Sequence, residues 1–183
     1  MIRPATPDDH QPAATLVWEA NGSVAQVLAG SGDPAESLTL FHEAFQARGN
    51  RLSFENSLVT VLDGRVVGVL VAYHGSQWSQ LDRPFRERLA RLGRTASIPR
   101  EARDDEFYLD SLAVDATFRG RGLGRELLAA FEQLGRERAH GRLGLLVDPE
   151  NARARRLYES AGFQPDHMLR IGGHAYQHMT RAL

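Results

Sequence analysis

Hydrophobic residues in this chain follow two spacings, which together predict a mixture of helices and strands. Spacings of three and four residues, typical of helices with one apolar face, occur over residues 13–20, 38–45, 82–92, 124–140 and 151–161. Runs rich in β-branched and other apolar residues predict strands over 57–62, 65–73, 106–114 and 143–147. Shorter strands are expected at 2–5, 163–164, 168–171 and 175–181. This order predicts one α/β (α+β) domain over residues 1–183.

Turn and cap residues fix several boundaries of these elements. Asp63-Gly64 lies between two strand patterns and predicts a tight hairpin. Asn151 is placed to cap the helix 151–161, and Gly162 follows that helix where a left-handed residue is favoured. A short helix to about residue 28 and a covering excursion over 75–103 complete the expected chain course.

The most informative stretch is a glycine-rich turn between the strand 106–114 and the helix 124–140. Gly120, Gly122 and Gly124 leave backbone N–H groups with no Cβ to crowd them. The helix that follows directs its free N–H groups and the positive end of its dipole back at this turn. The stretch therefore predicts a site for a phosphate or pyrophosphate group.

The spacing distinguishes between kinds of phosphate site. A dinucleotide fingerprint needs G-x-G-x-x-G, but Arg125 stands where the third glycine belongs. A P-loop needs Gly-Lys, and this chain contains no lysine. Both points disfavour a nucleotide-binding module. The pattern present is Arg-x-x-Gly-x-Gly at Arg119, Gly122 and Gly124, directly after a Leu-Ala-Val strand end. In these residues the sequence resembles the GNAT superfamily of acyl-CoA N-acyltransferases, most strongly over residues 106–164.

The resemblance implies a mixed, largely antiparallel sheet of six to seven strands with helices on both faces. It implies acetyl-CoA as cofactor, with pantetheine between the strands 106–114 and 143–147 and a backbone N–H near Leu112 facing the thioester oxygen. Asn151 would contact the pantetheine arm as well as cap its helix. The cofactor-binding set is Leu112, Ala113, Val114, Arg119, Gly120, Arg121, Gly122, Leu123, Gly124, Arg125, Asn151 and Tyr158.

Three residues are candidates for the chemistry. The resemblance brings the Tyr158 hydroxyl close to the coenzyme sulfur, where it would assist the departing thiolate, unless it is only a core tyrosine. Asp110 stands in a strand that aspartate disfavours, on the expected face of Leu112, and is the first candidate for general base, acting directly or through water. It would otherwise bind the cationic acceptor or serve as a structural acceptor, and Glu106 is the second candidate for base.

The composition excludes several classes of site. The absence of cysteine removes disulfides, thiolate metal sites and a thiol acyl intermediate. His174 and His178 would lie about 13 Å apart along a strand, so no metal site is expected. A net charge of −1 argues against binding to nucleic acid or a membrane surface. The first residues lack a signal-peptide pattern, which favours a cytoplasmic protein.

We therefore expect an acetyl-CoA-dependent N-acetyltransferase in which a primary amine attacks directly in a ternary complex. The alternative is a non-catalytic regulatory domain that binds acyl-CoA. The acceptor, a small amine or a peptide amine, is not readable from the sequence; its loops are expected within 20–56 and 75–103. Homodimers are common among GNAT proteins, so the resemblance leaves a homodimer open, although no sequence feature indicates one.

Overall fold

A seven-stranded sheet runs through the computed structural model, which describes residues 1–94, 97–138 and 140–183. The strands are β1 (Ile2–Pro4), β2 (Ser57–Leu62), β3 (Arg65–His74), β4 (Phe107–Val114), β5 (Arg142–Val147), β6 (Gln164–Ile171) and β7 (His174–Ala182). Their order in the sheet is β1-β2-β3-β4-β5-β7-β6. All neighbouring pairs are antiparallel except β4 and β5, which are parallel. The expected mixed, largely antiparallel sheet is confirmed.

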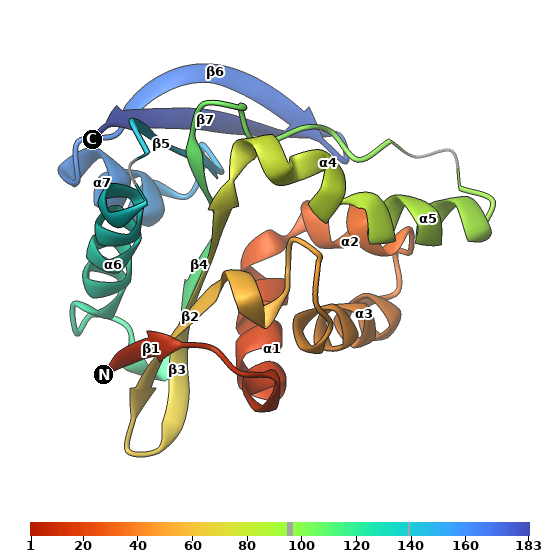
Figure 1. Cartoon of the computed structure of the whole chain (residues 1–183), viewed down its shortest axis with the longest axis horizontal. Helices are drawn as coiled ribbons and strands as arrows, with labels where there is room; N and C mark the ends of the chain where they lie inside the picture. Colours follow the sequence, from red (N-terminus) through yellow and green to blue (C-terminus); the bar gives the residue numbers. More distant parts are fainter. Residues whose placement is uncertain (95–96, 139) are drawn as a thin grey trace.

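Helices cover both faces of this sheet, as expected. They are α1 (His10–Asn21), α2 (Ser23–Ala29), α3 (Pro34–Gln46), α4 (Trp78–Leu81), α5 (Arg83–Arg91), α6 (Leu123–Glu137) and α7 (Ala152–Ser160). Figure 1 shows α6 and α7 on one side, and α1, α2 and α3 on the other. Each side has its own apolar core: Leu127 and Phe131 are buried in one, Phe41 and Phe45 in the other.

Most predicted boundaries are confirmed within one to three residues. Asp63 and Gly64 join β2 to β3 with φ values of 48° and 76°, the left-handed conformation that this hairpin turn requires. The two short strands expected at 163–164 and 168–171 belong to one strand, β6, and the residues between them form a bulge. Residues 95–96 of the predicted excursion, and residue 139 near the predicted end of the long helix, lie outside the described residues.

One prediction about β4 was wrong. Simple alternation placed Asp110 on the same face as Leu112, but the β3–β4 pairing shifts there: Val71 pairs with Ser111, and Ala72 with Leu109. Asp110 is thus the extra residue of a β-bulge, which changes the face of every residue after it. As a result Leu112 packs with the core beneath α6, while Asp110 points away from that core.

The parallel pairing between β4 and β5 is short. It joins Phe107, Tyr108 and Leu109 to Leu143, Gly144 and Leu145 and then stops. Residues 110–114 of β4 therefore lack a partner on the β5 side, which was the divergence expected from the resemblance. The main chain is open for hydrogen bonds at this position.

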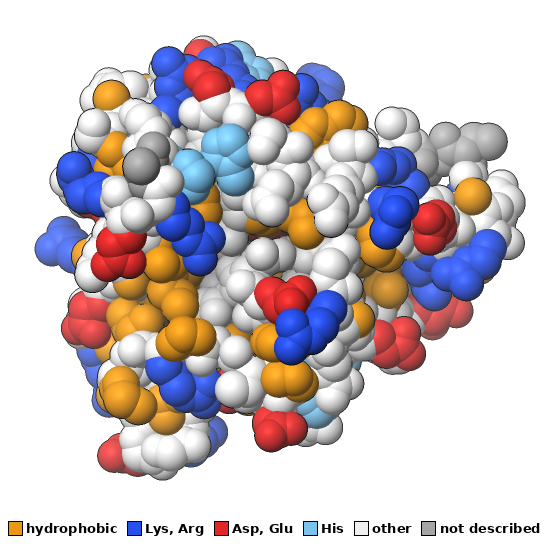
Figure 2. Space-filling view, in the orientation of Figure 1, with side chains coloured by type: hydrophobic (Ala, Val, Ile, Leu, Met, Phe, Trp, Pro, Cys, Tyr) orange, Lys and Arg blue, Asp and Glu red, His pale blue; other side chains and the backbone are white. Residues whose placement is uncertain are grey.

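On the face shown in Figure 2, arginine and acidic side chains are interspersed. Among the described residues, no helix has the length and apolarity needed to cross a bilayer.

Candidate active site

A cavity of about 920 Å³ lies where β4 and β5 separate. Its wall comes from the end of α1, the second half of β4, the glycine-rich turn, the end of β5, α7 and β7. Of the predicted cofactor residues, it is lined by Leu112, Ala113, Val114, Arg119, Gly120, Gly122, Leu123, Gly124, Arg125, Asn151 and Tyr158. Arg121 is not in this lining: its guanidinium stacks over the Phe118 ring at 5.0 Å.

Unpaired backbone amides gather at one end of this cavity. Gly120 and Gly122 have φ values of 82° and 86°, which only glycine adopts at little cost. Gly122 is the N-cap of α6, and the first amide to bond back into the helix is that of Arg125, at 2.9 Å from the Gly122 carbonyl. No described residue accepts a hydrogen bond from the five successive amides of residues 120–124. This arrangement fits a diphosphate, because the five N–H donors precede the positive end of the α6 dipole and four of their residues, Gly120, Gly122, Leu123 and Gly124, line the cavity.

Arg119, directly before these amides, also stabilises the turn. The Arg119 guanidinium donates through Nε to the Val114 carbonyl at 2.9 Å, which ties the turn to the end of β4. Because this contact uses only one of its five N–H donors, the remaining donors stay free for phosphate oxygens.

Tyr158 reaches the cavity from α7. Its side chain is buried against Phe163, and burial raises the pKa of its phenol to about 12. The hydroxyl is therefore protonated across the neutral range and acts as a hydrogen-bond donor. Full proton transfer to a thiolate of ordinary pKa is uphill by about 5 kcal/mol. The high pKa thus suits a hydroxyl that donates a hydrogen bond better than one that gives up its proton fully.

Asn151 begins α7 as predicted. Its side-chain oxygen accepts from the Ala154 amide at 3.0 Å, and the residue also lines the cavity. The N-cap prediction is confirmed, and the amide group of the same side chain keeps two donors for other partners.

The sequence of this chain matches known proteins over the same region. The sequence model of the acetyltransferase (GNAT) family matches residues 26–163, which is most of the chain. The chain belongs to this family. It is an N-acetyltransferase, and acetyl-CoA is the general acyl donor of the family.

Individual relatives agree with this assignment. A solved acetyltransferase is 33% identical over 100% of this chain and 98% of its own, with a TM-score of 0.78. An N-acetyltransferase from Staphylococcus aureus Mu50 is 26% identical over 99% of this chain and 100% of its own, with a TM-score of 0.85. A mycothiol acetyltransferase from Beutenbergia cavernae is 46% identical over 65 residues. The matched segment covers 36% of this chain and about a fifth (21%) of the relative's length.

Within this GNAT fold, Asp110 is held firmly. Its Oδ2 accepts from Arg51 Nε at 2.8 Å and from the Tyr73 hydroxyl at 3.1 Å. Its Oδ1 accepts from the Ser111 hydroxyl at 2.9 Å and retains a free lone pair. Ser111 Oγ in turn accepts from the Asn21 amide at 2.8 Å, and Ser111 lines the cavity. The carboxylate of Asp110 is therefore connected to the cavity by its hydrogen bond with Ser111.

Arg51 is the buried centre of a charged cluster that sequence reasoning missed. Its side chain is 1% exposed and pairs with Asp110, Glu101 and Asp82. Burial raises the pKa of both Glu101 and Asp82; the Arg51 guanidinium lowers it in part, and the neighbouring Asp110 carboxylate raises it again. The three acids come from segments far apart in sequence, so no local signal identifies the cluster.

Glu106, the second candidate for base, lies elsewhere. Its side chain is fully buried and accepts from the Arg103 amide at 3.0 Å, and His178 Nε2 lies 3.1 Å from its Oε1. It is not among the residues that line the cavity.

Further carboxylates line the cavity on the side of α1 and β5. Glu19 lies near the end of α1 and Asp148 directly after β5. Asp148 Oδ2 is 3.1 Å from His174 Nε2, and Tyr176, on the same wall, shares a 2.8 Å hydrogen bond with Ser23. Sequence reasoning did not select these residues, because they meet only when β5, β7 and α1 are assembled.

Gly124→Ala tests the amide cradle. A Cβ at this position meets Leu157 and Leu112 at 3.7 and 3.9 Å, which is ordinary contact, so the fold should tolerate the change. The methyl group would instead narrow the approach to the amides. We expect coenzyme A affinity, measured by calorimetry, to fall about tenfold, or roughly 1.4 kcal/mol, with thermal stability retained.

Gly32→Ala is the matched control, since a Cβ there meets nothing within 4 Å and the position is outside the cavity. Undiminished coenzyme binding by Gly124→Ala would contradict the assignment of the cradle.

The buried cluster makes stability depend on pH. Because the pKa of Glu101 is higher in the folded than in the unfolded chain, its contribution is fully present below the unfolded pKa. It is lost as pH rises through the folded pKa. Glu101→Gln should therefore flatten the decline of unfolding free energy as pH rises above the ordinary pKa of glutamate, measured by urea denaturation at a series of pH values.

Arg51→Met is the contrasting variant, because it leaves three buried acids without their cation. We expect it to cost about 3–5 kcal/mol. Equal slopes for Glu101→Gln and the unchanged protein would refute the role given to Glu101.

Proposed function

We propose that this GNAT protein transfers the acetyl group of acetyl-CoA to a primary amine by direct attack in a ternary complex. The row of five unpaired amides at residues 120–124 carries this proposal, since four of these residues line the same cavity as the unpaired edge of β4. With its diphosphate bound to these amides, coenzyme A would lay its pantetheine arm along residues 110–114. The arm would then pair with the sheet edge like a further strand.

Charge develops on the thioester oxygen as the amine nitrogen attacks the carbonyl carbon. A backbone N–H near Leu112 is the proposed donor to this oxygen, because residues 110–114 have no partner on the β5 side. The C–S bond then breaks, and the Tyr158 hydroxyl donates a hydrogen bond to the leaving thiolate. A high phenol pKa suits this role, as the hydroxyl keeps its proton before and after the step.

An ammonium group loses one proton before its nitrogen attacks and a second as the amide forms. We propose that Asp110 receives the first through Ser111 or a water molecule, and that the second passes to the leaving thiolate as the free thiol forms. The free lone pair on Asp110 Oδ1, beside the Ser111 hydroxyl, supports this route. The surrounding cluster has three carboxyl groups for one guanidinium, which favours uptake of a positive charge. Glu106 is not proposed as the base, because it contacts His178 instead of the cavity.

The distribution of charge around the cavity favours a cationic acceptor. The lining arginines belong to the glycine-rich turn and α7, where they suit the coenzyme phosphates. Glu19 and Asp148 line the cavity from the end of α1 and from directly after β5, while the carboxylate of Asp110, beside the β4 wall, is fully buried and paired with Arg51. An ammonium group is attracted to such a wall, and its local concentration rises accordingly. Small amines and peptide amines both satisfy this requirement.

Release of free thiol from acetyl-CoA in the presence of an amine panel tests the reaction directly. We expect thiol release with at least one cationic amine and a calorimetric signal with coenzyme A alone. Coenzyme binding without thiol release from any amine would favour the non-catalytic acyl-CoA-binding alternative, and no binding at all would reject the proposal.

Ser111→Ala tests the proton route. Removal of the hydroxyl should lower kcat by about 10²-fold or more and weaken the acidic limb of the pH profile, while leaving the KM for acetyl-CoA unchanged. Tyr158→Phe is the companion variant: it should lower kcat with no change in that pH limb. An unchanged kcat in Ser111→Ala would remove Ser111 from the route.

A further inference from the structure

The bulge in β6 brings three potential metal ligands together, away from the candidate active site. Pro165 pairs with Met179 and Met168 pairs with Gln177, so two residues of β6, Asp166 and His167, lie opposite the single residue His178 of β7. In a regular strand Asp166 and His167 would point to opposite faces, but the extra residue allows both to face His178. The ligand atoms of all three lie within 4.8 Å of one another.

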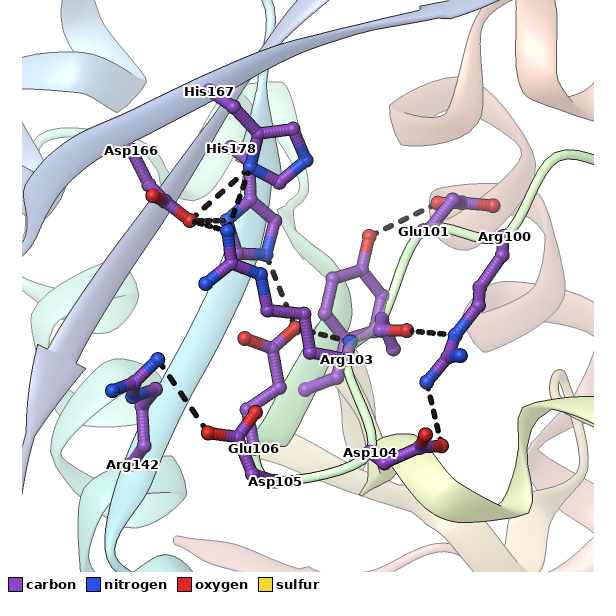
Figure 3. Close-up of polar contacts among 12 residues, drawn as sticks. Arg100, Glu101, Arg103, Asp104, Asp105, Glu106, Arg142, Asp166, His167 and His178 are labelled. Carbon is purple, nitrogen blue, oxygen red and sulfur yellow. Dashed lines mark hydrogen bonds and ion pairs between the residues drawn. The ribbon is translucent and has the colours of Figure 1, made fainter.

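The distances match those around one ion. Asp166 Oδ2 lies 3.1 Å from His167 Nδ1 and 3.2 Å from His178 Nδ1 (Figure 3). Ligands at about 2.1 Å from a tetrahedral Zn²⁺ are separated by about 3.4 Å. The imidazole rings of His167 and His178 are stacked with centroids 4.6 Å apart, and one ring nitrogen of each lies within 4.8 Å of the other and of Asp166.

His178 also has the outer contact that metal-binding histidines usually have. Its Nε2 lies 3.1 Å from Oε1 of Glu106, and both side chains are fully buried. Since a carboxylate only accepts, Nε2 carries a hydrogen, and Nδ1, which lies 3.2 Å from Asp166 Oδ2, is the ring nitrogen that a metal would use. Glu106, His178 and a bound ion would then form a carboxylate–histidine–metal arrangement.

A cationic side chain already occupies this position. The Arg103 guanidinium contacts Asp166 and lies 3.2 Å from His167 Nδ1, which can only accept from it. The arginine side chain is 40% exposed, so displacing it into water costs little. Arg103 therefore marks where positive charge is stabilised and competes with any ion that binds there.

We propose that Asp166, His167 and His178 bind a first-row divalent transition metal of the Zn²⁺ class. Two imidazoles and one carboxylate suit such an ion, and three protein ligands leave a position for water. The metal would join β6 to β7 across the bulge, with Glu106 orienting His178. The expectation of no metal site considered only His174 and His178 within one strand, and these are indeed four residues apart along β7. It did not consider cross-strand partners.

Titration of the full chain, without a histidine tag, with Co²⁺ tests the site by ligand-field absorption, and competition with a chromophoric chelator gives the Zn²⁺ affinity. We expect one equivalent of metal and a raised thermal midpoint. His178 is left intact because it is buried; the exposed ligands are varied instead. His167→Ala and Asp166→Asn should weaken Zn²⁺ binding at least about tenfold.

Arg103→Ala distinguishes a metal site from a purely structural network. A metal site predicts affinity up to about fivefold tighter, because the competing guanidinium is gone, whereas a structural network predicts only lower stability. His140→Ala is the matched control: it removes one ring of the other imidazole pair stacked at 4.6 Å, with His74, and should leave the affinity unchanged. No Co²⁺ absorption in both the unchanged protein and Arg103→Ala would overturn the proposal, as would equal affinity in His167→Ala.

Discussion

Hydrogen bonding between β4 and β5 ends after three residue pairs, and the rest of the site depends on that early end. The cavity opens where the pairing stops, and its wall includes the polar main chain of residues 110–114. Buried amides without partners are costly, so this edge requires either water or a ligand that hydrogen-bonds as a strand does. The glycine-rich turn places five further amides at the same opening. One gap in a sheet thus provides both halves of the proposed coenzyme site.

The bulge at Asp110 works together with that gap. By inserting one residue, it returns Leu112 and Val114 to the core beneath α6 and directs Asp110 toward Arg51 and Tyr73. The same strand therefore packs an apolar core and contributes to a charged cluster. Burying three acids around one arginine is expensive, and the fold retains this arrangement directly beside the cavity. The cost is consistent with a use in handling a positive charge.

Two of the bulges in this sheet, in β4 and β6, lie where chemistry is proposed. The bulge in β6 converts two consecutive side chains, which normally point apart, into neighbours of a single residue on β7. Glu106, directly before β4, contacts Nε2 of His178 through its carboxylate. In both bulged strands, a single added residue redirects polar groups without disturbing the apolar faces that hold the sheet together.

The sequence by itself determined what depends on neighbouring residues. The Asp63-Gly64 hairpin, the Asn151 cap and the glycine-rich turn before α6 are local, because they follow from φ preferences and hydrogen bonds spanning a few positions. The resemblance to GNAT proteins rested on such local signals. Only the tertiary structure decided the facing of Asp110, the partners of Arg51 and the meeting of Asp166 with His178. A strand's register depends on pairing with residues distant in the chain, and a shift of one position exchanges its faces.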